Sequence, residues 1–314
     1  MPDKEPPLIK FSDFFTLGWI PLLAALSWMI PERLWDAVAR GAVGLARWRA
    51  AARPRARQQH NRHALEGHVD AQTLHSMEIA HFHHRVVARM QSFREFRPGG
   101  WTPKIDVHGL EHIETALARG NGVVLWVSPF IYSDLVTKKG LHEVGCHVSH
   151  VSHPHHGFST TRFGVRFINP IGTRIEDRHL AERLLLGDAN ASASALMVAR
   201  RRLRQNRVVS ITVGRHAPKS VRVAFFDTEL ELSTGPVRLA RLTNAVLLSV
   251  FTVRTGTGTF AINIEGPLNR PSGQPGKNCD EVVFQRLVRG LERHILNQPS
   301  QFMADWRSPE FVDI

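Results

Sequence analysis

The stretch GLEHIETALARGNGVVLWVSPFIYSDL, residues 109–135, contains the pattern that decides the fold. Residues 111–119 repeat apolar side chains at helical spacing, and Gly120 and Gly122 then mark a turn. The run Val123–Val127 is apolar and rich in β-branched residues, which is typical of a short strand buried on both faces. The sequence therefore predicts a helix, a turn and a central strand.

Polar and aromatic residues follow this strand directly, in the segment SPFIYSD at positions 128–134. The carboxyl ends of the strands are where open α/β sheets gather their ligand-binding groups. We therefore predict the functional site at this segment.

Length and composition favour one α/β domain with a helical addition at its N-terminus. The chain has 314 residues, of which 43% are hydrophobic, so it can bury a large core. We expect a helical region over residues 1–100 and the α/β domain over residues 101–314. Only two cysteines occur, which argues against a disulfide framework or a thiolate zinc site and favours a reducing compartment.

The charge balance indicates an anionic partner. The net charge is +12 and the isoelectric point is about 10.8. A phospholipid leaflet, a phosphorylated glycolipid, an acidic carrier and a nucleic acid all fit such a charge. The chain has no Walker-type loop, no dinucleotide-binding fingerprint and no known nucleic-acid recognition motif.

The N-terminal region carries an apolar segment. Residues 14–30 contain no charged side chain, and Trp19 and Trp28 are of the type that settles at a membrane interface. A run rich in arginine follows over residues 40–62, which is typical of the cytoplasmic side of a membrane anchor. We expect membrane attachment here, and the alternative is a buried helix beside a solvated basic face.

Two groups of histidines stand out. The first lies in a predicted helix over residues 64–96, where we expect surface histidines rather than metal ligands; it comprises His75, His81, His83 and His84. The second group lies in and after a predicted strand over residues 146–152. We expect its members to line a groove, or one of them to supply a catalytic base. The group comprises His147, His150, His153, His155 and His156.

The remaining elements are predicted from apolar periodicity and turn residues. We expect strands at residues 208–213 and 260–267, a hairpin at 221–232, helices at 189–206, 237–243 and 280–296, and two helices joined by a strand-like turn over 158–186.

Several segments resemble the bacterial lipid A late acyltransferases, a branch of the lysophospholipid acyltransferase superfamily. The resemblance runs from about Gly109 to Arg307. It is strongest in FFDTELELSTGPVRLARLTNAVLLSVFTVR, where the matching positions are Phe225, Phe226, Thr234, Gly235, Pro236, Leu239, Ala240, Thr243, Ala245 and Arg254. The end of the chain echoes the family's ending at Pro299, Gln301, Trp306 and Arg307.

The resemblance implies a glycerolipid-acyltransferase-like mixed sheet flanked by helices, with a membrane-associated helical segment before it. The family's catalytic box is H-x4-[DE], and here Phe130 and Asp134 match its Phe and its acid. Pro129 stands where the family has its histidine, the general base on the acceptor hydroxyl. An acidic motif that the family places after the strand at 208–213 is replaced here by Gly214, Arg215 and His216.

The implied function is transfer of an acyl chain from an acyl-thioester, on acyl carrier protein or coenzyme A, to a lipid or glycolipid acceptor. Asp134 is the candidate catalytic residue, and its alternative role is the N-cap of the next helix. The candidate substrate-binding residues are Ser128, Phe130, Tyr132, Arg174, Arg215 and His216. We expect no metal and no cofactor apart from the donor, an anionic membrane lipid as partner, no nucleic acid, and a location at the cytoplasmic face of the inner membrane.

A second hypothesis follows from the two departures at the site. A chain that lacks both the motif histidine and the acidic motif after residue 213 is what a catalytically inactive member of the fold would look like. Such a member binds acyl lipid or scaffolds a partner enzyme.

Overall fold

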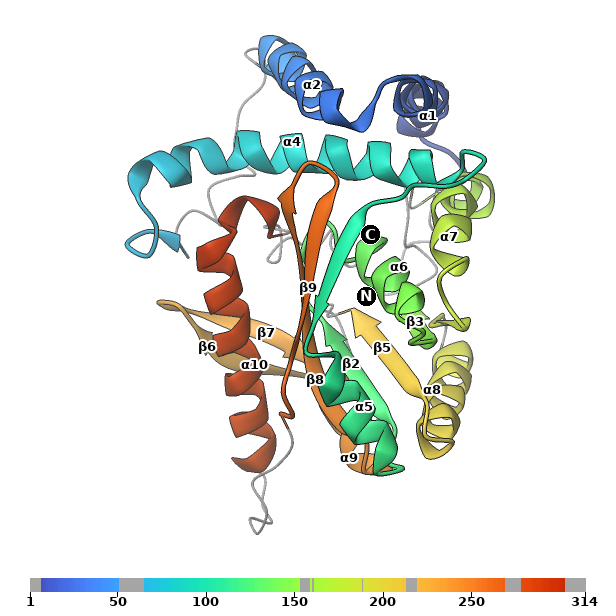
Figure 1. Cartoon of the computed structure of the whole chain (residues 1–314), viewed down its shortest axis with the longest axis vertical. Coiled ribbons are helices and arrows are strands. Elements are labelled where there is room, and N and C mark those ends of the chain that lie inside the picture. The colour runs from blue at the N-terminus through green and yellow to red at the C-terminus, as the bar shows by residue number, and fades with distance from the viewer. Residues whose placement is uncertain are drawn as a thin grey trace.

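A mixed seven-stranded sheet forms the centre of the described structure (Figure 1), with the strand order β1-β9-β8-β2-β5-β3-β4. The strands β8, β2, β5, β3 and β4 run parallel to one another, while β9 is antiparallel to β8 and β1 is parallel to β9. Their bounds are β1 Lys104–His108, β2 Val123–Val127, β3 Val148–Ser152, β4 Glu182–Leu185, β5 Val208–Thr212, β8 Val246–Gly256 and β9 Thr259–Glu265.

The computed structural model describes residues 7–50, 65–152, 159, 161–187, 189–212, 219–268 and 278–302. The helices in this part of the chain are α1 Phe11–Met29, α2 Trp35–Ala50, α4 Ala71–Glu95, α5 Leu110–Ala118, α6 Val136–Glu143, α7 Asn169–Asp177, α8 Ala189–Arg204, α9 Gly235–Thr243 and α10 Asn278–Asn297. Shorter helical turns cover Glu32–Leu34, Gly164–Ile168 and Pro299–Gln301. A separate antiparallel hairpin joins β6 Ser220–Phe225 to β7 Thr228–Ser233.

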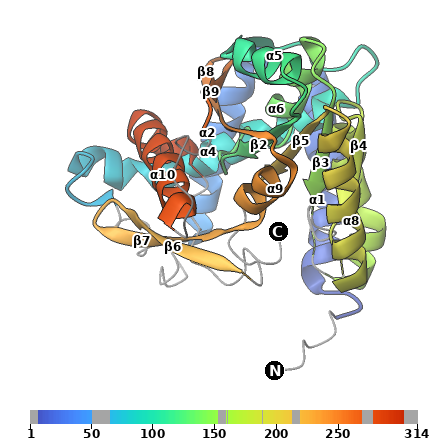
Figure 2. The same ribbon diagram turned by 90° about the horizontal axis from the view of Figure 1, so that it is seen from below.

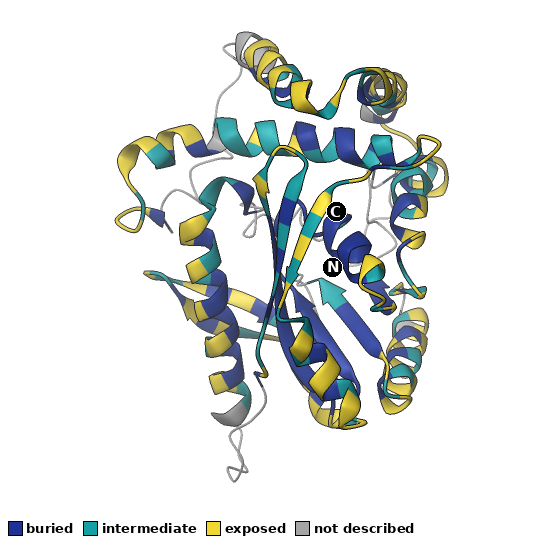
Figure 3. Ribbon diagram, viewed as in Figure 1, coloured by how far each residue is buried: buried dark blue, intermediate teal, exposed yellow. Residues whose placement is uncertain are grey.

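The central strand β2 is buried on both faces, as the sequence predicts. All five of its residues are buried. Val124 and Trp126 pack into a core built with α8, α9, α10 and the β6–β7 hairpin. Val123, Leu125 and Val127 pack into a second core on the opposite face, with α5 and α6. This division places one layer of helices on each side of the sheet (Figure 2), and the central strands are buried between these layers (Figure 3).

The long helix α4 crosses the sheet beyond the carboxyl ends of β2 and β5, and α1 and α2 lie on its outer side (Figure 1). Contacts between α4 and both N-terminal helices are extensive. The turn that follows β2 therefore lies beneath α4. None of the helices in the described ranges has the length and hydropathy to cross a bilayer.

Two parts of the fold differ from the sequence prediction. The second of the two helices predicted over residues 158–186 does not extend to residue 186; α7 ends at Asp177, and Glu182–Leu185 form the edge strand β4. This strand pairs with β3 through Val151 and Leu184. The stability gained from this pairing outweighs the weak helical preference of the segment. The strand β1 was not predicted, because Lys104–His108 alternates around an exposed aspartate and lysine. The division of the chain near residue 100 stays a prediction.

Candidate functional site

The turn after β2 is fixed to the neighbouring strand β8. The N–H of Ser128 donates to the carbonyl oxygen of Val250 at 3.0 Å, and the Ser128 hydroxyl donates to the same oxygen at 2.9 Å. The N–H of Phe130 then donates to the carbonyl of Ser128 at 2.9 Å, which closes a three-residue turn around Pro129. Ser128 is fully buried, so its hydroxyl serves the turn, and its predicted contact with substrate stays a prediction.

The C-terminal part of the described chain supports the same turn. Phe130 is buried and forms an antiparallel bridge with Phe302, their ring centroids 5.7 Å apart. The N–H of Ile131 donates to the carbonyl of Gln301 at 2.9 Å. The side chain of Gln301 in turn exchanges hydrogen bonds with the backbone of Arg254, at 2.8 and 2.9 Å. Gln301 therefore couples the turn to the end of β8, while the substrate role of Phe130 stays a prediction.

Tyr132 joins the turn to α4. Its hydroxyl lies 2.8 Å from Nδ1 of His84, and its ring packs edge-on against the rings of His84 and Phe260. Burial raises the pKa of Tyr132 well above its usual range. Burial, together with the positive charges of His83 and Arg254, lowers the pKa of His84 to about 4. A protonated phenol and a neutral imidazole therefore share this hydrogen bond near neutral pH.

A partly buried ion pair holds α2 on the same network. Arg254 donates to both carboxylate oxygens of Asp36 at 2.8 Å, and Nε2 of His83 lies 3.3 Å from Asp36 Oδ1. The hydrogen bond from Arg254 holds the pKa of Asp36 below its usual range. His83 and His84, predicted as surface histidines, are partly buried, because their side of α4 packs on α2 and on the turn after β2. His75, one helical stretch earlier, is exposed.

Asp134 lies at the end of the turn, and it does not cap the next helix. The N-cap position of α6 is Leu135, and no side chain there accepts a hydrogen bond from the helix. Arg89 of α4 is close enough for the Asp134 carboxylate to raise its pKa. Burial outweighs that effect and lowers the pKa of Arg89 to about 10, so the guanidinium stays charged near neutral pH. Asp134 is partly exposed and lies beside a cationic group of α4.

Glu176 of α7 is the second carboxylate that acts on Arg89. Its Oε2 also lies 2.5 Å from Nζ of Lys138 on α6 and 2.9 Å from Nη2 of Arg183 on β4. These three side chains are nearly fully buried, so the charges compensate one another inside the protein. The group orders α6 and α7 around the turn that contains Asp134.

The sequence profile of the family described as bacterial lipid A biosynthesis acyltransferase matches residues 73–306, more than half of the chain. The chain belongs to this family. The matched range begins in α4, well before the Gly109 at which the resemblance is visible in the sequence, and it includes both β2 and the turn after it. No curated protein matches the chain.

The family resemblance at Thr234, Gly235 and Pro236 has a structural explanation. Thr234 is the N-cap residue of α9, and Pro236 lies in the first turn of the helix. The Thr234 hydroxyl donates to the carbonyl of Lys219 at 3.1 Å, so it ties the helix start to the hairpin rather than capping the helix by its side chain. In this member of the lipid A acyltransferase family, the motif joins α9 to the β6–β7 hairpin.

The other predicted site residues of this acyltransferase-family chain are exposed or lie outside the described residues. Arg174 is exposed on α7. Arg215 and His216 follow β5 but lie outside the described residues, as do His153, His155 and His156 after β3. Within the described ranges, no group of three or more histidine, cysteine or acidic side chains is placed to hold a metal ion. The expectation that the protein uses no metal stays a prediction.

Two further histidines were candidate bases. His147 is exposed and directly precedes β3. It therefore lies at the amino ends of the parallel strands, whereas Asp134 follows the carboxyl end of β2. The ring of His147 is 5.4 Å from that of His142. His150 is buried within β3, where its Nδ1 lies 2.8 Å from the hydroxyl of Ser210 on β5. The structure thus brings neither of them to the turn. Among the described histidines, His84 is the one that hydrogen-bonds to the turn, and its position on a predicted surface helix concealed it.

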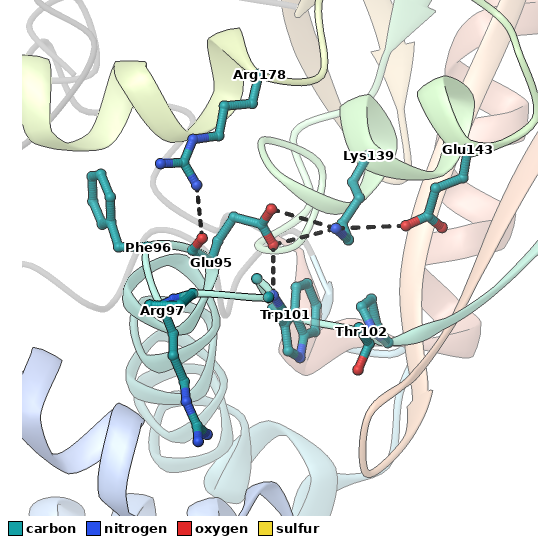
Figure 4. A pocket seen from close by; sticks show the side chains of 12 residues that line it. Glu95, Phe96, Arg97, Trp101, Thr102, Lys139, Glu143 and Arg178 are labelled. Carbon is teal, nitrogen blue, oxygen red and sulfur yellow. Dashed lines mark hydrogen bonds and ion pairs between the residues drawn. The ribbon is translucent and has the colours of Figure 1, made fainter.

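A cavity of about 570 Å³ opens at the C-terminal end of α4, in the connection to β1 (Figure 4). The carboxylate of Glu95 forms part of its wall, accepts a hydrogen bond from the N–H of Trp101 at 3.1 Å and pairs with Lys139 at 3.3 Å. Burial would raise the pKa of Glu95, but hydrogen bonds from His179 and Trp101 hold that pKa below its usual range. The wall is internally paired, and none of the predicted site residues lines it.

The burial of His84, which lowers its pKa, makes the stability of the protein depend on pH. The folded pKa of His84, about 4, lies below the unfolded value of 6.5, so the unfolded chain binds more protons between these values. Its contribution is complete above about pH 6.5 and is lost as the pH falls toward 4. Between about pH 6.5 and 4 the wild-type protein loses unfolding free energy as His84 takes up a proton. We expect this loss to be smaller by about 2–3 kcal/mol in His84→Gln.

Urea denaturation at a series of pH values measures this difference. His75→Gln, at an exposed position of the same helix, is the matched control and should keep the wild-type pH dependence. If the unfolding free energies of His84→Gln and of the wild type fall by the same amount between neutral and acidic pH, partial burial does not lower the pKa of His84 in the folded protein.

Proposed function

We propose that this chain transfers an acyl group from an acyl-thioester to a hydroxyl or amine of a lipid or glycolipid acceptor. Membership of the lipid A acyltransferase family supports the reaction class. The observation that carries the assignment of the site is the place of Asp134, in the turn after the central strand, partly exposed and within electrostatic range of the charged Arg89 of α4. The donor is acyl carrier protein or coenzyme A, and no further cofactor takes part.

In the proposed reaction, the acceptor oxygen or nitrogen forms a bond to the acyl carbon and the carbon–sulfur bond of the thioester breaks. The proton lost by the acceptor passes through a base to the departing thiolate. Asp134 orients the acceptor, or orients a histidine that takes the place of the missing motif base. Arg174, Arg215 and His216 supply positive charge to acceptor phosphates or to the developing oxyanion.

The base itself is the open position in this proposal, because Pro129 has no group that accepts a proton. His84 joins the candidates from the sequence, since its neutral imidazole is bonded to Tyr132 of the turn. An amine acceptor that arrives unprotonated lowers the demand on a base. A positioned base contributes about 10²- to 10⁴-fold in rate, so a chain without one still turns over slowly through positioning of its substrates.

The proposed place of action is the cytoplasmic face of the inner membrane, with anionic lipid as the partner. The net charge of +12 and the apolar residues 14–30 support this location, and nothing in the sequence favours a nucleic acid as partner.

Mass spectrometry of lipid products tests the function directly. The purified full chain in detergent is incubated with acyl carrier protein and coenzyme A thioesters of graded chain length, together with membrane lipid extract. We expect an acceptor lipid heavier by one acyl group, formed only with donor and protein together. Absence of such a product with every donor contradicts the proposed reaction.

The second candidate function is an inactive member of the family that binds acyl lipid or scaffolds a partner enzyme. The proline at position 129 and the segment Gly214-Arg215-His216 favour it, because both depart from the family pattern. Acyl lipid that co-purifies with the chain, without any acylated product in the assay, supports this function over the first.

A further inference from the structure

The outer face of α1 is apolar and exposed over its whole length. Phe11, Phe14, Leu22 and Met29 are 87%, 59%, 50% and 82% exposed, and they recur at spacings that place them on one side of the helix. Gly18 completes this side without adding a polar group. Exposed hydrophobic residues of this size, gathered on one side of a helix, indicate a surface that contacts a partner or a membrane.

The opposite face of α1 is fastened to the body of the protein. Asp13 is 1% exposed, and its carboxylate accepts hydrogen bonds from the hydroxyls of Ser159 at 2.6 Å and Thr161 at 2.8 Å. Nearer the other end, Nε1 of Trp28 donates to the carbonyl of Phe93 on α4 at 2.8 Å. Contacts with Ser159 and Thr161 near one end and with α4 near the other therefore hold α1 against the body of the protein, on the outer side of α4 (Figures 1 and 3).

Charges in the described segment 7–50 are sorted between the two sides. Its three acidic residues, Asp13, Glu32 and Asp36, all face the protein. Asp13 accepts the hydrogen bonds described above. Glu32 accepts a hydrogen bond from the indole N–H of Trp101 at 3.1 Å, and Asp36 accepts one from Arg254. Its exposed charged side chains are instead basic, and comprise Lys10, Arg33 and Arg40. The outward surface around α1 thus combines hydrophobic and cationic groups and carries no exposed carboxylate from this segment.

A second segment extends the surface at the start of α1. The N–H groups of Arg162 and Phe163 donate to the carbonyls of Pro7 and Leu8 at 3.1 and 3.0 Å, so the two segments are adjacent. Phe167 is 56% exposed nearby in the chain, and the guanidinium of its neighbour Arg166 lies over its ring at 5.5 Å. This segment therefore exposes aromatic and basic side chains together, as the outer face of α1 and its surroundings do.

We propose that this surface, which we call the α1 face, binds an anionic phospholipid bilayer with α1 lying in the plane of the interface. The α1 face comprises Lys10, Phe11, Phe14, Leu22, Met29, Arg33, Arg162, Arg166 and Phe167. An amphipathic helix with aromatic and aliphatic side chains on one side and basic groups around it binds in this way, the apolar side entering the acyl boundary and the basic groups facing the phosphates. The contacts of Asp13 and Trp28 hold α1 on the outer side of α4, which it crosses, so α1 enters the interface without leaving the protein.

The inference deepens the membrane location proposed above and rests on it. Because α4 separates the α1 face from the turn after β2, the turn lies one helix layer below the bilayer surface (Figure 1). Its test needs no turnover: binding to vesicles is measured on the full chain without donor or acceptor. Failure of acyl transfer and failure of this inference are therefore distinguishable.

Co-sedimentation with vesicles of phosphatidylcholine and phosphatidylglycerol tests the α1 face. We expect the wild-type chain to bind these vesicles at least about tenfold more tightly than vesicles of phosphatidylcholine alone. Leu22→Glu should weaken binding to the mixed vesicles by at least about tenfold, because it removes apolar surface and places a carboxylate at the anionic interface. Leu242→Glu on α9 is the matched control, since Leu242 is 51% exposed and lies away from the α1 face.

The outcomes decide between the possible occupants of the surface. Wild-type affinity in Leu22→Glu, or equal losses in both variants, overturns the inference. A lower oligomeric state in Leu22→Glu with unchanged vesicle binding also overturns it and indicates a second copy of the chain as the occupant. An alkaline carbonate wash should release the bound chain from the vesicles, and a chain that stays in the pellet contradicts the in-plane arrangement.

Discussion

Replacing Asp134 by Ala is expected to lower the rate of acyl transfer by at least about 10²-fold while the protein stays folded. The proposed role of the carboxylate is to orient the acceptor or a base, and such a role contributes at this scale. Asp134 is partly exposed and does not cap α6, so its loss removes no helix cap. The rate of formation of acylated lipid, measured by mass spectrometry beside thermal unfolding, checks both parts.

Two further variants make the Asp134 result specific. Asp134→Asn keeps the size of the side chain and removes its charge, and it should lose activity as Asp134→Ala does if the charge is what matters. Asp106→Ala removes an exposed aspartate on β1 and should keep the wild-type rate. Unchanged turnover in Asp134→Ala would remove this residue from the mechanism.

Replacing Pro129 by His is expected to raise the rate of acyl transfer by about 10²- to 10⁴-fold, the contribution of a positioned general base. The backbone accepts this change, because the turn is closed by the N–H of Phe130 and needs no N–H from position 129. Pro129 is partly exposed, so an imidazole at this position has access to solvent and substrate. Steady-state rates with the best donor and acceptor measure the gain.

Pro129→Gln is the control for this gain. It removes the proline ring and adds a polar side chain of similar size, but it supplies no group that accepts a proton near neutral pH. We expect it to keep the wild-type rate within a few-fold. A gain in Pro129→Gln equal to that in Pro129→His would assign the effect to release of the backbone rather than to a base.

Much of the fold was predictable because single segments carried complete patterns. The apolar run Val123–Val127 predicted a strand buried on both faces, and each of its residues is buried. The alternation in residues 221–232 predicted the hairpin that the structure forms as β6 and β7. Thr234 and Pro236 predicted the start of α9, which lies where the sequence placed it. These features depend on neighbours close in the chain.

The features that were not predictable depend on contacts between distant segments. Residues 182–185 become a strand only through their pairing with β3. His84 is partly buried because it forms a hydrogen bond beneath α4 with Tyr132, which lies 48 positions later in the chain. Asp36 and Arg254 lie 218 positions apart, and nothing in either local pattern indicates that they form an ion pair. Sequence spacing does not encode such pairs.

The candidate site was predicted in its position more than in its contacts. Asp134 was placed at the carboxyl end of the central strand, and the structure has it there. The bond from the Ser128 hydroxyl to the carbonyl of Val250 was not anticipated, because this acceptor lies on a strand that is distant in sequence, and the predicted contact of Ser128 with substrate stays a prediction. The cationic neighbour Arg89 was not anticipated, because it reaches the turn from α4.

The central claim is that positions 129 and 134 belong to one reacting centre. Acyl-transfer rates of four proteins test it most directly: the wild type, Asp134→Ala, Pro129→His and the double variant. We predict that the gain from Pro129→His is at least about tenfold larger when Asp134 is present, because the carboxylate orients the new imidazole. An equal gain with and without Asp134, or no gain in a folded Pro129→His protein, would contradict the claim.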